Sequence, residues 1–191
     1  MKNIVILASG TGTNAQNIIN YFRHSAQIKV SLILSNNPKA GVLKIAQQEN
    51  IPHYIIEKGK FFSSGFYIDL FHQYQINLIV LAGFLWKVPP RLVHAFPDKI
   101  INIHPALLPL YGGKGMYGQY VHEAVMKARE MQSGITIHYV NENYDEGNII
   151  FQQSCDITEE DTPLSLAQKV HELEYEWYPK VIEELLNAPI P

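Results

Sequence analysis

Short runs of aliphatic and β-branched residues alternate with amphipathic segments along this chain, and this alternation restricts its fold more than any other feature. The runs at 4–8, 30–34, 53–56, 78–81 and 100–103 are predicted strands. Segments reaching to about residue 23, and at 40–49 and 62–74, are predicted helices. Run 78–81 is apolar throughout, as in a central parallel strand covered on both faces. The pattern predicts an α/β fold: a Rossmann-like, mostly parallel sheet with helices on both faces.

The second half of the chain begins with a loop in which four glycines fall within residues 112–118. A helix is predicted at about 120–131, and strands at 134–140 and 149–156 flank a turn at 143–148. The last helix should open at Asp161-Thr162-Pro163, a cap followed by proline in the first turn. Because no linker, repeat or low-complexity tract interrupts the pattern, we expect one domain over residues 1–191.

Charge and cysteine content exclude several classes of protein. Fifteen basic and eighteen acidic residues give a net charge of −3, which argues against a nucleic-acid surface. The single cysteine, Cys155, is predicted to be a packing residue and indicates a reducing compartment. The apolar run 4–8 is too short for a signal peptide, and no stretch approaches the ~20 apolar residues of a membrane span. We therefore expect a cytoplasmic protein that binds neither membrane nor nucleic acid.

The glycine-rich segment Ser9–Ala15 lies between the first predicted strand and helix. Its spacing fits the dinucleotide fingerprint, but the second strand ends in Ser-Asn-Asn (35–37), without the carboxylate that a ribose would need. No Gly-Lys-Ser/Thr follows, so it is not a Walker A loop. Two interpretations stay open. The helix amides, with Thr13 and Asn14, hold a phosphate, or the turn is capped by Thr or Asn and binds nothing.

Polar side chains also interrupt the fifth predicted strand, at Asn102 and His104. Being two apart, they share one face at the carboxyl end of the strand, where open α/β sheets bind ligands. The alternative is that His104 is a core histidine with satisfied hydrogen bonds. Asp145 lies in the later turn, and a carboxylate near His104 would raise its pKa. An imidazolium beside an amide donor would stabilise an oxyanion. Spacing alone equally allows Asp145 to be an ordinary turn residue.

Four strings together resemble the phosphoribosylglycinamide formyltransferases, the folate-dependent enzymes of purine synthesis. They are Ser-Gly-Thr-Gly-Thr-Asn at 9–14, Leu-Ala-Gly-Phe at 81–84, Asn-Ile-His-Pro-Ala-Leu-Leu-Pro at 102–109 and Asp-Glu-Gly-Asn-Ile-Ile at 145–150. The likeness covers nearly the whole chain. It implies transfer of a formyl group from 10-formyltetrahydrofolate, the co-substrate, to the amine of glycinamide ribonucleotide, with no metal.

The resemblance also implies roles for particular residues. Asn102 would hold the formyl oxygen, and His104 would be proton donor and oxyanion partner, with Asp145 raising its pKa. The phosphate would be held by Gly12, Thr13 and Asn14. Glu174 would meet the glycyl amine, one turn after His171. The formyl-folate would lie against the backbone of two segments: Leu85, Trp86, Lys87 and Val88, and Asn141, Glu142, Asn143, Tyr144 and Asp145.

Some positions depart from the family pattern. Ser64 stands where relatives carry a cation that meets the folate, with Lys58 and Lys60 nearby, and Trp86 stands where arginine is common. Two alternative functions remain, a formyltetrahydrofolate hydrolase and a non-catalytic nucleotide-binding module. We expect a monomer or a homodimer.

Overall fold

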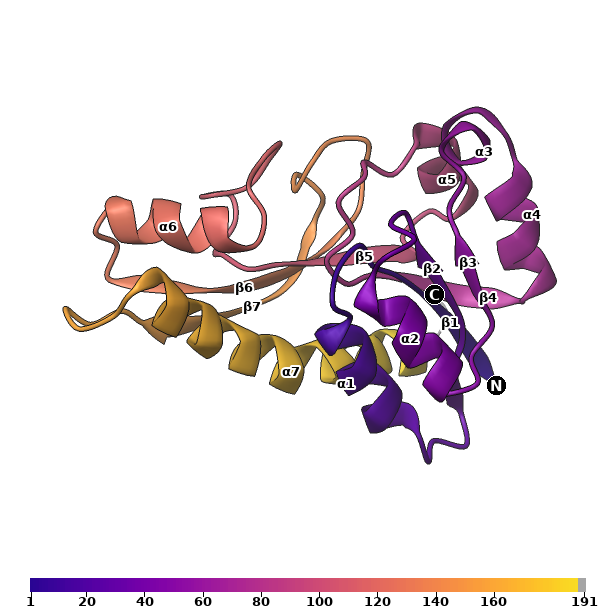
Figure 1. Ribbon diagram of the computed structural model, residues 1–191, viewed down its shortest axis with the longest axis horizontal. Helices are drawn as coiled ribbons and strands as arrows, with labels where there is room; N and C mark the ends of the chain where they lie inside the picture. The colour runs from indigo at the N-terminus through magenta and orange to yellow at the C-terminus, as the bar shows by residue number, and fades with distance from the viewer. Residues whose placement is uncertain (189–191) are drawn as a thin grey trace.

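A seven-stranded sheet forms the centre of the protein in a computed structural model that describes residues 1–188 (Figure 1). The strand order is β3-β2-β1-β4-β5-β6-β7. All neighbours pair in parallel except β5 with β6 and β6 with β7. The predicted mostly parallel α/β sheet is confirmed. The strands are β1 Lys2–Leu7, β2 Ile28–Ser35, β3 His53–Ile55, β4 Ile76–Leu81, β5 Ile100–His104, β6 Gln132–Tyr139 and β7 Ile149–Asp156.

Helices cover both faces of the sheet because successive strand residues point to opposite sides. In β1, Ile4 and Ile6 belong to one buried cluster, whereas Val5 and Leu7 belong to the other. The first cluster contains side chains of α1, α2, α6 and α7, and the second those of α3, α4 and α5. The helices are α1 Thr13–Phe22, α2 Gly41–Gln48, α3 Lys58–Ser63, α4 Phe66–Gln73, α5 Pro90–Ala95, α6 Gln119–Lys127 and α7 Pro163–Asn187.

The sequence predicted one continuous helix over 62–74, and this prediction is wrong. Ser64 and Gly65 separate α3 from α4, and α3 begins already at Lys58. The Ser64 hydroxyl donates to the carbonyl of Lys60 at 2.8 Å and accepts from the amide of Phe66 at 3.2 Å. It thus offers both helix ends a local partner in place of the continuous helical ladder. The short α5 was not predicted, and α6 ends before residue 131 because Arg129 has φ +57°.

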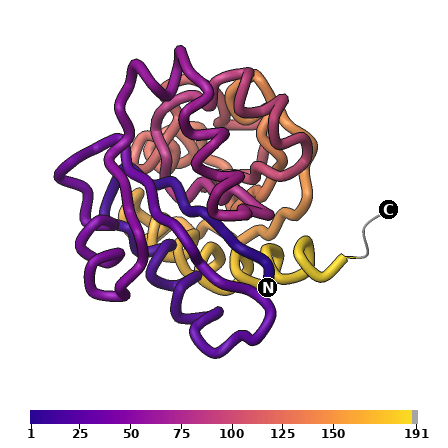
Figure 2. Tube along the Cα trace, turned by 90° about the vertical axis from the view of Figure 1, so that its right-hand side faces the viewer, coloured from indigo at the N-terminus to yellow at the C-terminus, as the bar shows by residue number. Residues whose placement is uncertain are grey.

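The long helix α7 begins at the predicted cap. The Thr162 hydroxyl accepts from the Ser165 amide, and the Ser165 hydroxyl accepts from the Thr162 amide. α7 packs against α1, α6, β6 and β7, and Figure 2 shows it in yellow, leading toward the C-terminus at the right. Its buried Tyr178 donates to the carbonyl of Leu81 at the end of β4. The helix is therefore fixed to the sheet where the central strands end.

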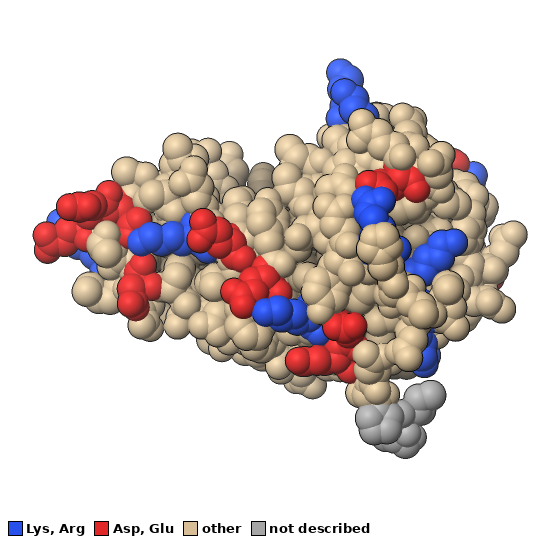
Figure 3. All heavy atoms as spheres, turned by 90° about the horizontal axis from the view of Figure 1, so that it is seen from below, with Lys and Arg blue, Asp and Glu red and all other residues tan. Residues whose placement is uncertain are grey.

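The surface carries charges of both signs. Figure 3 shows Lys and Arg interspersed with Asp and Glu along the lower face, without a large patch of one sign in that view. Within residues 1–188, no helix is both long enough and apolar enough to cross a membrane. Cys155 is half-buried on β7, an edge strand, beside the core, where its position agrees with packing.

Candidate active site

A cavity of about 970 Å³ opens at the carboxyl ends of β1, β4 and β5. β1 lies between β2 and β4, so the chain adds strands first on one side of β1 and then on the other. At such a switch point the loops that follow the neighbouring strands turn away from each other and leave a crevice for a ligand. The lining consists of residues 9–14, 82–85, 102–105, 113–119, 122, 144–145, 163–164, 167, 171 and 174. The topology therefore brings the glycine loop, the Asn-His strand and α7 to one site.

The amino end of α1 forms one end of this cavity. Gly12 precedes the helix with φ +85°, and no side chain caps it, so the alternative of a turn capped by Thr or Asn is not found. The first-turn amides of α1 are left for a ligand, and an uncapped helix start favours an anion. A Cβ on Gly12 would lie 2.8 Å from the Cα of Val42, so glycine also permits the close approach of α2.

Hydrogen bonds hold the loops after β1, β2 and β4 together. The Ser9 hydroxyl donates to the Asn36 side-chain oxygen at 2.6 Å and accepts from the Leu85 amide at 2.8 Å. The Asn37 side chain donates to the Ser9 carbonyl at 3.3 Å. Asn36 and Asn37, which stand where a dinucleotide site would need a carboxylate, instead brace the glycine loop.

Asn102, His104 and Asp145 meet at the floor of the cavity. His104 Nδ1 lies 3.6 Å from Asp145 Oδ2, and Asn102 Nδ2 lies 3.5 Å from Asp145 Oδ1. His104 Nε2 is 2.8 Å from the Tyr111 carbonyl, so this nitrogen carries the proton in the neutral ring. The separation at Nδ1 is too long for a strong hydrogen bond, which leaves Nδ1 available to a ligand oxygen.

The prediction that His104 has a raised pKa is wrong for the free protein. Burial lowers the pKa of His104 below its ordinary value, and this outweighs the opposing effect of the Asp145 charge. The side chain is only 3% exposed. Asp145 does favour the imidazolium, as expected, but it only limits the decrease in the pKa of His104. His104 is therefore neutral at pH 7 until a second negative charge, in addition to that of Asp145, develops beside it.

His138 completes this group and was not identified from the sequence. It is paired with Asn102 across β5 and β6, and Asn102 Nδ2 lies 3.1 Å from its Nε2. His138 Nδ1 lies 2.9 Å from the Tyr139 carbonyl, so in the neutral ring Nε2 accepts from the Asn102 amide. The available signal was the alternation of Thr136 and His138 in a predicted strand, because both would face one side.

Asp145 also joins two loops, which Figure 1 shows rising on the same side of the sheet. Its Oδ2 accepts from the Gly113 amide at 2.9 Å, and its backbone has φ +56°. Burial works to raise the pKa of Asp145, but His138, the His104 charge and the Gly113 amide together hold it below its usual value. The carboxylate is thus kept ionised, and it fixes the glycine-rich loop over the cavity.

At the opposite wall, α7 presents Glu174 and His171. Glu174 Oε2 accepts from Asn14 Nδ2 at 2.8 Å, and His171 Nδ1 lies 2.8 Å from the same oxygen. The hydrogen bond with Glu174 raises the pKa of His171, although burial opposes it. The sequence-predicted substrate residues Gly12, Thr13, Asn14, His171 and Glu174 therefore line one continuous wall.

The predicted folate segments reach the cavity only in part. Leu85, Asn102, Tyr144 and Asp145 line it, whereas Trp86, Lys87, Val88, Asn141, Glu142 and Asn143 do not. Val88 is a core side chain, and Trp86 packs on Phe61 and Phe62. Lys87 Nζ lies 5.9 Å from the Tyr144 ring centroid, which brings the two segments together at the rim.

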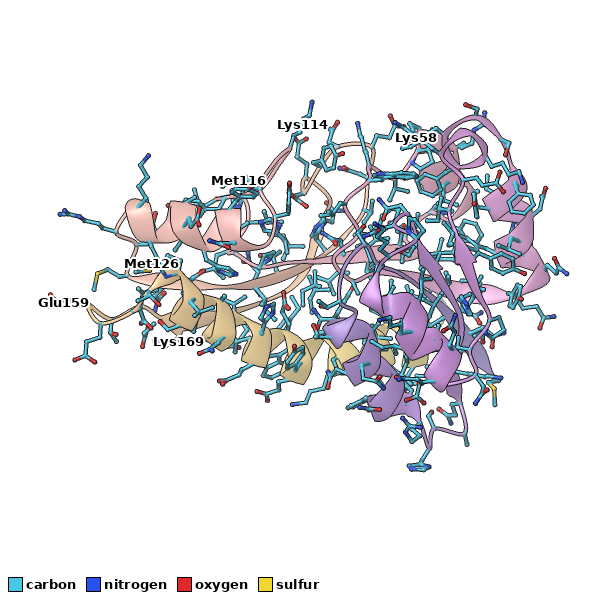
Figure 4. The ribbon with its side chains drawn as sticks, viewed as in Figure 1. Lys58, Lys114, Met116, Met126, Glu159 and Lys169 are labelled. Atoms are coloured by element: carbon cyan, nitrogen blue, oxygen red, sulfur yellow. The ribbon has the colours of Figure 1, made fainter. Side chains whose placement is uncertain are left out.

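The cations near Ser64 differ in their availability. Lys60 is paired with Glu57 at 2.7 Å and lies over the Phe66 ring. Figure 4 places Lys58 beside α3, and places Lys114 at the tip of the glycine-rich loop, pointing outward.

Within the described part of the chain, no group of three His, Cys, Asp or Glu side chains is arranged to hold a metal ion.

The chain resembles known proteins over nearly its whole length. The sequence profile described as formyl transferase matches residues 2–182. The chain is similar to phosphoribosylglycinamide formyltransferase of Bacillus subtilis (35% identity, covering 98% of this chain and 96% of that one). It is also similar to the chloroplastic protein of that name from Arabidopsis thaliana (37%, covering 99% and 67%). The crystal structure of the Streptococcus pneumoniae phosphoribosylglycinamide formyltransferase matches with a TM-score of 0.85 at 34% identity, covering 98% of this chain and all of that one.

Proposed function

The chain belongs to the formyl transferase family and is an enzyme, and we propose that it formylates the amine of glycinamide ribonucleotide with 10-formyltetrahydrofolate. The observation that carries this proposal is the single cavity that joins an uncapped helix start to the Asn102, His104 and Asp145 group. A phosphate at α1 places the other end of a phosphorylated amine near that group. This reaction belongs to purine biosynthesis.

The substrate amine attacks the formyl carbon directly. Asn102 has one amide hydrogen directed at His138 and another held only by a 3.5 Å contact with Asp145, so the second is free to reach the formyl oxygen. His104 Nδ1 is the other donor once the ring is protonated. Because a developing oxyanion favours a nearby imidazolium, His104 takes up a proton from solvent as the tetrahedral intermediate forms, and returns it to solvent when the intermediate collapses.

Proton movement completes the transfer. Attack gives the amine nitrogen a positive charge, and that nitrogen must lose a proton while the folate nitrogen gains one as its bond to the formyl carbon breaks. Asp145, which is kept ionised, holds a water that relays this proton. No covalent enzyme intermediate and no metal are required. The folate lies at the rim formed by residues 85–88 and 141–145.

Replacing Asp145 with asparagine should lower kcat by about tenfold or more, because the charge that supports the His104 imidazolium is lost. The pKa of His104 should fall further below its ordinary value. As the pH rises, activity that depends on protonated His104 should therefore be lost at a lower pH in the variant than in the parent protein. NMR titration of the His104 ring measures this shift.

The control is Glu146→Gln, which removes an exposed charge from the same loop. An unchanged His104 titration in Asp145→Asn would contradict the proposed pairing.

The acceptor is tested by varying it. With glycinamide ribonucleotide, folate release should be fast and should depend on acceptor concentration. The dephosphorylated riboside should lose at least about 100-fold in kcat/KM, because charge-assisted hydrogen bonds at α1 are lost. Rapid folate release without any amine would instead establish the hydrolase alternative, and binding of both substrates without folate release would contradict the proposed reaction.

The remaining features of the proposal concern the whole protein. We expect one formyltransferase domain over residues 1–191, present in the cytoplasm as a monomer or a homodimer. Sedimentation of the purified protein measures its oligomeric state.

A further inference from the structure

His122 on α6 is a buried histidine to which the mechanism above gives no role. It is 2% exposed, yet it lines the cavity. Its Nδ1 is sealed in the interior and has no hydrogen-bond partner among residues 1–188. A histidine used only for packing would leave this polar atom buried at a cost, where an apolar side chain would have none.

The unpartnered Nδ1 determines which of the two ring nitrogens carries the hydrogen in the neutral ring. An orphaned buried N–H is rarer and costlier than an orphaned lone pair, so the neutral ring carries its proton on Nε2. Burial, the His171 charge and the His104 charge lower the pKa of His122, and Glu174 only partly opposes them. The ring is therefore neutral at pH 7 and carries one N–H donor, at Nε2, on a residue that lines the cavity.

The position of His122 identifies what this donor meets. His122 lines the same cavity as His104, His171 and Glu174, and the charges of these three groups affect its pKa. The phosphate is proposed at the start of α1, where Asn14 holds Glu174, and the reacting amine is proposed at His104. The part of the substrate between phosphate and amine is the ribose.

We propose that His122 is a substrate-binding residue whose Nε2 donates a hydrogen bond to a ribose oxygen of the phosphorylated amine. This inference rests on the proposed function, and it adds α6 to the elements that select the acceptor. The glycine-rich loop that precedes α6 contacts the same core as that helix. Its Met116 packs against the core cluster that contains Val121 and Val125 of α6. Figure 4 shows Met116 beside α6.

The test uses three variants of the full chain. His122→Leu removes the donor and the buried orphan atom together. It should raise the KM for glycinamide ribonucleotide roughly five- to tenfold, without lowering the melting temperature and without changing the KM for the formyl-folate co-substrate. His122→Gln, whose amide nitrogen reaches about as far as Nε2, should recover most of the loss. His122→Asn, whose amide is nearer to the Nδ1 position, should not.

Calorimetry with ribose 5-phosphate separates this inference from the proposed function. If the parent does not formylate glycinamide ribonucleotide, the proposed function fails, while weaker binding of ribose 5-phosphate by His122→Leu still supports the role of His122. Unchanged acceptor KM and unchanged ribose 5-phosphate binding in His122→Leu would overturn the inference. An equal loss of melting temperature in all three variants would also overturn it, because it would indicate packing alone.

Discussion

Replacing His104 with alanine is expected to lower kcat for formyl transfer by on the order of 10²–10³, because one preorganised donor to the oxyanion is removed. Binding of both substrates should change little, since this donor is needed only when negative charge develops on the formyl oxygen. The neutral state of His104 in the free protein agrees with that timing. Single-turnover kinetics, together with calorimetry on each substrate, separates the rate effect from binding.

A matched control is His24→Ala, which truncates an exposed histidine in the turn after α1. It should keep the parent rate. Near-parental turnover in His104→Ala would show that the proposed oxyanion partner is misassigned, and the role of Asp145 would fail with it.

Replacing Gly12 with valine should weaken binding of glycinamide ribonucleotide by at least about 100-fold, because two or more charge-assisted hydrogen bonds to the phosphate are lost. The backbone at Gly12 has φ +85°, and a Cβ there would meet Cα and Cβ of Val42 at 2.8 Å. With this Cβ present, the start of α1 and the adjoining part of α2 cannot both keep their positions. Binding of a formyl-folate analogue, measured by the same calorimetry, should change little.

Gly10→Ala is the control, because a Cβ at Gly10 has no heavy atom within 4 Å. Its melting temperature should stay close to that of the parent. Dinucleotides should not bind the parent protein, since Asn36 braces the glycine loop and no carboxylate stands in its place. Equal loss of folate-analogue binding in Gly12→Val, or tight dinucleotide binding by the parent, would contradict the assignment of this loop.

The sheet could be predicted from sequence because its signal is local. Runs such as 78–81 are apolar on both faces, and β4 is buried between β1 and β5 as that pattern requires. The division of 62–74 into α3 and α4 escaped prediction because it depends on hydrogen bonds of one side chain, Ser64. The short α5 contains six residues, less than two helical turns, so its apolar residues do not form a repeating pattern.

From spacing alone, the site could be predicted where its residues lie in a strand or directly follow one. Asn102 and His104 share a face by the period of a strand, and the glycine loop follows β1 directly. His138 shared a predicted strand face with Thr136, but its importance depends on the pairing of β6 with β5. His122 had no such signal, because its importance depends on the packing of α6 against α7. The sign of the His104 pKa shift also depends on tertiary burial, which no local pattern reveals.

The central claim is direct transfer of the formyl group to a phosphorylated amine, and isotope tracing tests it most directly. The protein would be given 10-formyltetrahydrofolate carrying ¹³C in its formyl group, together with glycinamide ribonucleotide, and the products would be followed by NMR. The account predicts that the label appears on the amine of the ribonucleotide in equal amount to the tetrahydrofolate released. Label recovered as free formate, at the same rate with and without the amine, would contradict it.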